Sequence, residues 1–151
     1  MTPEEHHRLG VELYNGTWEL IERPDRTPDE DDEMLDRAHA SAYHWLHAAS
    51  TTAANRARSQ WLCSRVHAIT GQPEGALHHA RRCVAIVEGH GDEMEDWDLA
   101  AAHEALARAH LAAGNGDEAR RLVELARAET ATIAEDDDRK HIEADLDALP
   151  L

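Results

Sequence analysis

The sequence predicts an all-α protein, a stack of six or seven helices paired as antiparallel hairpins. Alanine, the strongest helix former, occurs 27 times among 151 residues, whereas valine and isoleucine together occur ten times and phenylalanine is absent. Residues that favour strands are therefore scarce. Apolar residues follow the three-and-four spacing of helices between glycines and prolines that recur about every twenty residues. The chain also repeats itself, as helical-hairpin proteins do.

The first four helices follow from their start and stop signals. Thr2 and Glu5 form a capping-box pattern ahead of the first. Residues 22–31 combine two prolines with a charge cluster and predict an exposed loop that ends by capping the second helix. Gly71 is expected in the left-handed conformation after the third helix, and Gly89 closes the fourth. The predicted ranges are 3–21, 32–48, 53–70 and 73–88.

Three further helices are predicted in the C-terminal part of the chain. The loop 89–96 leads to a helix that Gly114 ends, and aspartates open the next two, where they suit the positive end of the helix dipole. The acidic runs 28–33 and 135–138 are interpreted as solvated caps. The predicted ranges are 96–113, 117–134 and 137–149. One domain of residues 1–151 results, with a divergent hairpin over 1–50, hairpins over 53–89 and 96–134, and a C-terminal capping helix over 137–149.

Composition limits the classes of function. Asp and Glu number 31 and Lys and Arg 15, so the formal net charge is −16 with histidine neutral. Nucleic-acid backbones and anionic membranes require a cationic footprint, so neither is expected as a partner. The chain opens with acids where a signal peptide has a basic start, and it has no long apolar run, so we expect a cytoplasmic protein.

Two hairpins align at an offset of 43 residues. This offset places Gly71 on Gly114 and His67 on His110, and the turn that follows each glycine keeps its length. A repeated helical hairpin is the simplest interpretation of these matches.

The repeated hairpins resemble the tetratricopeptide-repeat (TPR) family over about residues 56–128. Hairpins of that family carry a small residue, an aromatic residue three positions later and a glycine at the turn, and histidine stands here at the aromatic position. The matching residues are Ser64, His67, Gly71, Ala76, Ala80 and Cys83 in the first copy and Ala107, His110, Gly114, Ala119, Val123 and Ala126 in the second. The resemblance implies a right-handed stack whose concave groove binds a protein or peptide partner. Residues 39–45 are also similar to a segment of uncharacterised bacterial proteins.

The resemblance also implies which side chains line the groove. Trp61 and Arg65 occupy groove positions in the first copy, and Glu104 and Arg108 occupy them in the second. Two guanidinium groups along one groove would suit a carboxylate or phosphate, so a small anionic ligand is an alternative to a peptide. Each pair is spaced by four residues, and a cation–π contact and a surface ion pair explain the same residues without any ligand.

Twelve histidines make a metal site the rival hypothesis. Helices of a bundle could bring His39 or His44 together with His79 and Glu104. The spacing matches no zinc motif, so neither a metal nor another cofactor is predicted. His67, His103 and His110 need no metal to explain them, because each can fill a gap between helices.

The remaining reactive side chains do not form a catalytic motif. Cys63 and Cys83 fall on apolar helix faces and are expected to be buried, unreactive thiols. Tyr43 and His44 belong to the densest aromatic patch, part of which is expected to border the groove. We therefore expect an interaction module that catalyses no reaction. The alternatives are an enzyme or metal protein, and a structural subunit of a homo-oligomer.

Overall fold

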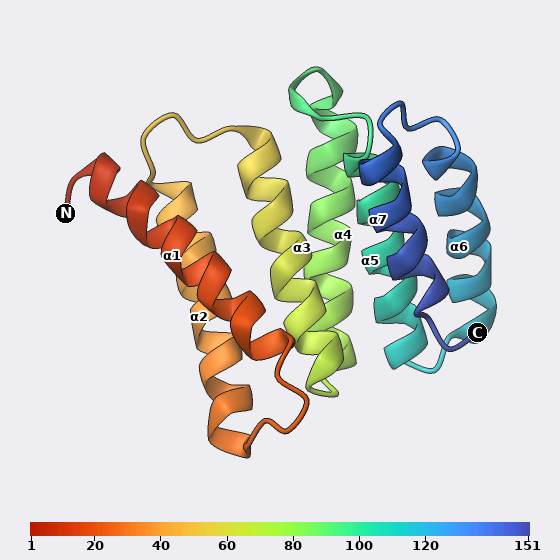
Figure 1. Ribbon diagram of the computed structural model, residues 1–151, viewed down its shortest axis with the longest axis horizontal. Coiled ribbons are helices and arrows are strands. Elements are labelled where there is room, and N and C mark those ends of the chain that lie inside the picture. Colours follow the sequence, from red (N-terminus) through yellow and green to blue (C-terminus); the bar gives the residue numbers. More distant parts are fainter.

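The computed structural model describes residues 1–151 and contains seven α-helices, one short 3-10 helix and no strand (Figure 1). The all-α class predicted from composition is therefore confirmed. None of the helices is both long and apolar enough to cross a membrane. The elements are α1 (Pro3–Ile21), α2 (Pro28–Leu46), α3 (Ala53–Ile69), α4 (Pro73–Gly89), η1 (Gly91–Glu93), α5 (Asp98–Ala112), α6 (Gly116–Thr130) and α7 (Asp136–Asp147).

Helices that follow one another in the chain are neighbours in space. The closest pairs are α1 with α2, α3 with α4, and α5 with α6, and further contacts join α2 to α3 and α4 to α5. Figure 1 shows the resulting row of hairpins, which runs from the N-terminal pair to α6. The last helix, α7, lies against α5 and α6.

Local sequence sets most helix ends where they were predicted. The Thr2 hydroxyl accepts a hydrogen bond from the Glu5 main-chain N–H, and the Glu5 carboxylate accepts one from the Thr2 N–H. This arrangement is the expected capping box. Gly71 and Gly114 have φ angles of 73° and 81°, so both adopt the left-handed conformation that only glycine enters without strain.

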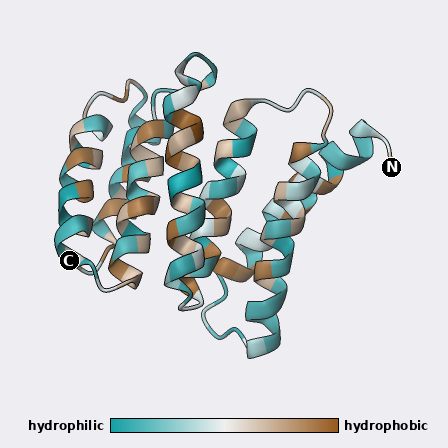
Figure 2. Cartoon of the chain, turned by 180° about the vertical axis from the view of Figure 1, so that it is seen from behind, coloured by the Kyte–Doolittle hydropathy of each residue, from teal (hydrophilic) through white to brown (hydrophobic).

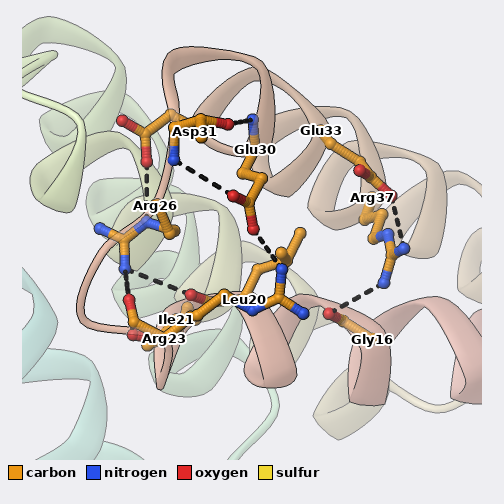
Figure 3. Close-up of polar contacts among 10 residues, drawn as sticks. Gly16, Leu20, Ile21, Arg23, Arg26, Glu30, Asp31, Glu33 and Arg37 are labelled. Atoms are coloured by element: carbon orange, nitrogen blue, oxygen red, sulfur yellow. Dashed lines mark hydrogen bonds and ion pairs between the residues drawn. The ribbon is translucent and has the colours of Figure 1, made fainter.

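The start of α2 was predicted wrongly. The helix begins at Pro28 instead of residue 32, because Thr27 and Glu30 form a second capping box and Pro28 takes the first helical position. A proline at this position removes no helical hydrogen bond, because the first N–H groups of a helix have no acceptor within it. The loop after α1 is correspondingly shorter. Arg26 fixes it by donating to main-chain oxygens at the end of α1 and by pairing with an acid in the first turn of α2 (Figure 3).

The end of α6 also differs from the prediction. The helix stops at Thr130 instead of residue 134. The following turn buries Ile133, only 2% exposed, in a core cluster with Ile142 and Leu146 of α7. The helix therefore ends where the chain turns to bury this side chain against α7.

Small side chains dominate the core, which consists of four clusters between neighbouring helices. One cluster contains only alanines among its buried members: Ala76, Ala80, Ala105 and Ala109. Trp61, on α3, packs against all four clusters and so lies at the centre of the molecule. Hydrophobic residues (brown in Figure 2) alternate with hydrophilic ones (teal) along the helices, as expected where each helix buries one face against its neighbours.

Candidate functional site

A cavity of about 450 Å³ opens between α1, α3, α5 and α7, with α4 at its floor. Four aromatic side chains form its walls: Tyr14, Trp18, Trp61 and Trp97. The two central rings, Trp18 and Trp61, are stacked with centroids 5.7 Å apart. We call this site the tryptophan cavity. Concave, largely apolar sites with a few polar groups are where proteins bind ligands.

Trp61 carries an unused hydrogen-bond donor at this site. Its indole Nε1 is buried and has no partner within the protein. Buried indole N–H groups are normally satisfied, because a lost hydrogen bond is costly in a medium of low dielectric constant. The Trp61 N–H is thus enclosed without a partner, and what the tryptophan cavity offers a ligand is its aromatic surface.

The two arginines predicted to line a groove instead hold a carboxylate of the protein itself. Arg108 donates from Nε and Nη2 to Glu104 Oε1, at 2.9 and 2.7 Å. Arg65 Nη2 lies 3.6 Å from Glu104 Oε2 and 3.5 Å from Asp145 Oδ1. Glu104 is 1% exposed, and its Oε2 faces Arg65 as an ion pair without a hydrogen bond. The ring of Trp61 also lies 4.7 Å from the Arg65 guanidinium, which is the local cation–π contact that the spacing allowed.

Acidic groups outnumber basic ones around the tryptophan cavity. Arg58 and Asp98 neutralise each other through two hydrogen bonds of 3.1 and 2.9 Å. Glu22, Asp138 and Asp145 also line the cavity, and only Asp145 contacts an arginine. The site therefore carries an excess of negative charge, which favours a cationic ligand over an anionic one.

Burial keeps two polar groups in the cavity wall neutral. It raises the pKa of the Tyr14 phenol. Burial, with a smaller contribution from the charge of Asp98, raises the pKa of the Cys83 thiol to about 12. Since a thiol of that pKa carries little thiolate at neutral pH, Cys83 serves as part of an apolar wall.

Tyr43 and His44 do not reach the tryptophan cavity. They lie on α2 beside the N-terminal turns of α1, where His44 Nδ1 is 2.8 Å from His6 Nδ1. The ring of Tyr43, 57% exposed, lies 4.8 Å from that of His47. The structure thus separates this aromatic patch from the other predicted groove residues.

A second cluster brings together His39 of α2, His67 of α3 and His79 of α4, with one ring nitrogen of each within 4.8 Å of the others. Two members, His39 and His79, belong to the alternative metal set predicted from the sequence. His44 and Glu104 of that set lie elsewhere. His67, interpreted as a packing residue, takes their place.

His103 occupies a different environment from this cluster. It is 7% exposed, and its Nδ1 lies 2.6 Å from Glu129 Oε1 on the neighbouring helix. This contact matches the expectation that a histidine fills the gap between two helices.

Sequence reasoning found Trp61 but missed the other walls of the cavity. A signal for one of them was present. The offset of 43 residues, continued backwards, places Trp18 on Trp61 and Glu22 on Arg65. The residues of α7 had no such signal, because that helix has no counterpart in the repeat.

Comparisons with models of known protein families, with curated proteins and with solved structures give no match. The fold and the site together define an all-α protein of paired helices with an acidic, aromatic cavity. A fold by itself does not fix a function, so the function has to be argued from the chemistry of the site.

Proposed function

We propose that this chain is an interaction module, a TPR-like right-handed stack of hairpins, that binds a basic peptide segment in the tryptophan cavity. The observation that carries the proposal is the cavity itself, walled by Tyr14, Trp18, Trp61 and Trp97. Its volume of about 450 Å³ accommodates side chains rather than a whole folded partner. A lysine or arginine side chain matches both of its chemical features.

The first feature is the aromatic surface. Ammonium and guanidinium groups are attracted to the faces of tryptophan rings, and the attraction grows as the site is desolvated. The protein already uses this contact internally, since Arg58 lies 4.5 Å from the Trp97 ring centroid.

The second feature is charge. Asp138 lines the cavity, is half-buried and forms no ion pair. With Glu22 and Asp145 it provides an acidic rim for an incoming cation. An anionic ligand would meet the same rim and find Arg65 already engaged with Glu104 and Asp145. Of the two ligands expected from the sequence, the charges therefore support the peptide over the small anionic ligand. They favour a peptide with a basic sequence.

The test compares two short peptides of equal length, one alternating lysine with alanine and one alternating glutamate with alanine. Binding is followed by isothermal titration calorimetry at low and at moderate salt. We expect the lysine peptide to bind, with an affinity that falls as salt rises, and the glutamate peptide not to bind. Preference for the glutamate peptide would refute the proposal and favour the anionic ligand, and equal binding would refute the charge argument.

Matched variants locate the binding site. Asp138→Asn is expected to weaken the lysine peptide several-fold and Trp61→Phe about tenfold. The controls are Asp117→Asn, at a fully exposed carboxylate on α6, and Trp45→Phe, at the one tryptophan outside the cavity. Both controls are expected to bind like the parent protein. Equal losses in variants and controls would place binding elsewhere.

A further inference from the structure

The three rings of His39, His67 and His79 face one another across three helices. The Nε2 atoms of His39 and His67 lie 2.9 Å apart, and the rings of His67 and His79 are stacked with centroids 5.4 Å apart. The rings of His39 and His79 are 5.1 Å apart. No residue of this histidine cluster lines the tryptophan cavity, so the two sites are independent.

A separate side chain contacts the Nδ1 atom of each ring. The Nδ1 of His79 lies 2.7 Å from Gln60 Oε1, and the Nδ1 of His67 lies 3.2 Å from Gln72 Oε1. An amide oxygen only accepts hydrogen bonds, so both Nδ1 atoms carry the proton and both Nε2 atoms keep their lone pairs. Behind His39, the Cys63 sulfur lies 3.8 Å from Nδ1. Without a metal, the His39 Nε2–H donates across the 2.9 Å to the His67 Nε2, and a bound metal ion would displace this proton.

This pattern is typical of metal ligands. A histidine that binds a metal through one nitrogen donates its other N–H to a fixed acceptor, which sets the tautomer and orients the ring. The space is also shaped for the ring of His67, because a side chain at Gly75 would place its Cβ 2.5 Å from His67 Nδ1. Packing alone requires neither three converging imidazoles nor acceptors behind them.

We propose that His39, His67 and His79 form a binding site for a divalent transition-metal ion, with Zn²⁺ as the best-matched ion. Three neutral imidazoles are suitable ligands for such ions, and three protein ligands leave a fourth tetrahedral position open for water or another ligand. Tetrahedral Zn²⁺ with bonds of about 2.0–2.1 Å requires nitrogens roughly 3.3 Å apart. The three ligand atoms already lie within 4.8 Å of one another, so small ring rotations complete the site.

The protonation state of the cluster supports the assignment. Burial, with repulsion from the other histidines, lowers the pKa of His79 to about 3. Burial also lowers the pKa of His39 and His67. These shifts favour the neutral form of the three rings, the form in which imidazole binds a metal.

The test is a Zn²⁺ titration of tag-free, chelator-treated protein, followed by isothermal titration calorimetry and by thermal unfolding. We expect one tightly bound equivalent and a rise in melting temperature, because the ion ties together three helices. His67→Gln is expected to weaken binding at least about tenfold. Gln72→Ala, which removes an exposed acceptor and no ligand, is expected to weaken it about 10–100-fold.

The matched control is His44→Gln, in the other group of neighbouring histidines on α1 and α2. Its Zn²⁺ affinity and stoichiometry are expected to equal those of the parent protein. Should His67→Gln fail to fold, His39→Gln provides the same test at an exposed position. Less than one equivalent bound, or an equivalent that is lost in His44→Gln and kept in the cluster variants, would overturn the assignment.

Discussion

Replacing Glu104 by glutamine should strongly destabilise the protein. The Glu104 carboxylate, 1% exposed, is the shared partner of Arg108 on its own helix and Arg65 on α3. Glutamine keeps the shape but removes the charge. Arg65, only 9% exposed, would then have Asp145 as its only acidic partner.

The size of the effect follows from burial. Removing one member of a buried ion pair costs about 3–5 kcal/mol, because the remaining charge stays desolvated without compensation. We expect a loss of unfolding free energy near the lower end, about 3 kcal/mol. The reason is that Arg65 keeps its contact with Asp145 and that the glutamine amide oxygen can still accept hydrogen bonds. For a chain of this size that corresponds to a fall in melting temperature of about 6–12 °C.

Urea unfolding followed by circular dichroism measures the change against a matched control, Glu12→Gln. Glu12 pairs with Arg8 at 3.0 Å, also across four residues, but the two side chains are 57% and 60% exposed. Its loss is expected to cost less than about 1 kcal/mol. Adding Arg65→Met to Glu104→Gln should recover part of the loss, since the uncompensated guanidinium is then gone. Equal costs for Glu104→Gln and Glu12→Gln would refute the argument.

Three further predictions concern other parts of the molecule. Because burial raises the pKa of Cys63 and Cys83 to about 12, a thiol reagent at pH 8 should label the folded protein slowly and the urea-unfolded protein rapidly. Gly71→Ala, at φ 73°, should cost about 1–2 kcal/mol in urea unfolding, whereas Gly89→Ala, at a helical position, should be neutral or stabilising. The pKa of His79 falls from 6.5 to about 3 on folding, so below pH 6.5 the unfolded chain binds more protons. The urea midpoint of metal-free protein should therefore decrease from pH 7 to pH 5, and less so in His79→Gln.

The sequence predicted the helices well because their ends depend on nearby residues. The capping box at Thr2 and the left-handed glycines at 71 and 114 are contacts within a few residues, and all of them are present. The two larger errors have different causes. At α2, a capping box starting at Thr27 was overlooked although it is local. At the end of α6, the burial of Ile133 against α7 is a tertiary effect that no local pattern contains.

The sites were harder to predict because they depend on how the hairpins lie side by side. The sequence placed Arg65 and Arg108 at equivalent positions, but it could not show that Glu104 lies between them. His39 and His67 are separated by the last turns of α2, a loop and most of α3. Only the packing of α2 on α3 brings their Nε2 atoms to 2.9 Å. Spacing rules for metal ligands describe sites within one motif, so they miss a site that spans three helices.

The C-terminal helix α7, predicted as a capping helix, also forms a wall of the tryptophan cavity. Asp138, His141, Ile142 and Asp145 of α7 all line it. Asp145 also reaches Arg65 at 3.5 Å, so the same residue binds α7 to the centre of the stack and contributes to the acidic rim. Ile142 and Leu146 are buried in the largest core cluster, which holds these acids in place. The negative charge at the cavity therefore comes largely from α7, a helix outside the repeat. Any preference of the cavity for a cationic partner depends on the packing of α7 against the rest of the protein.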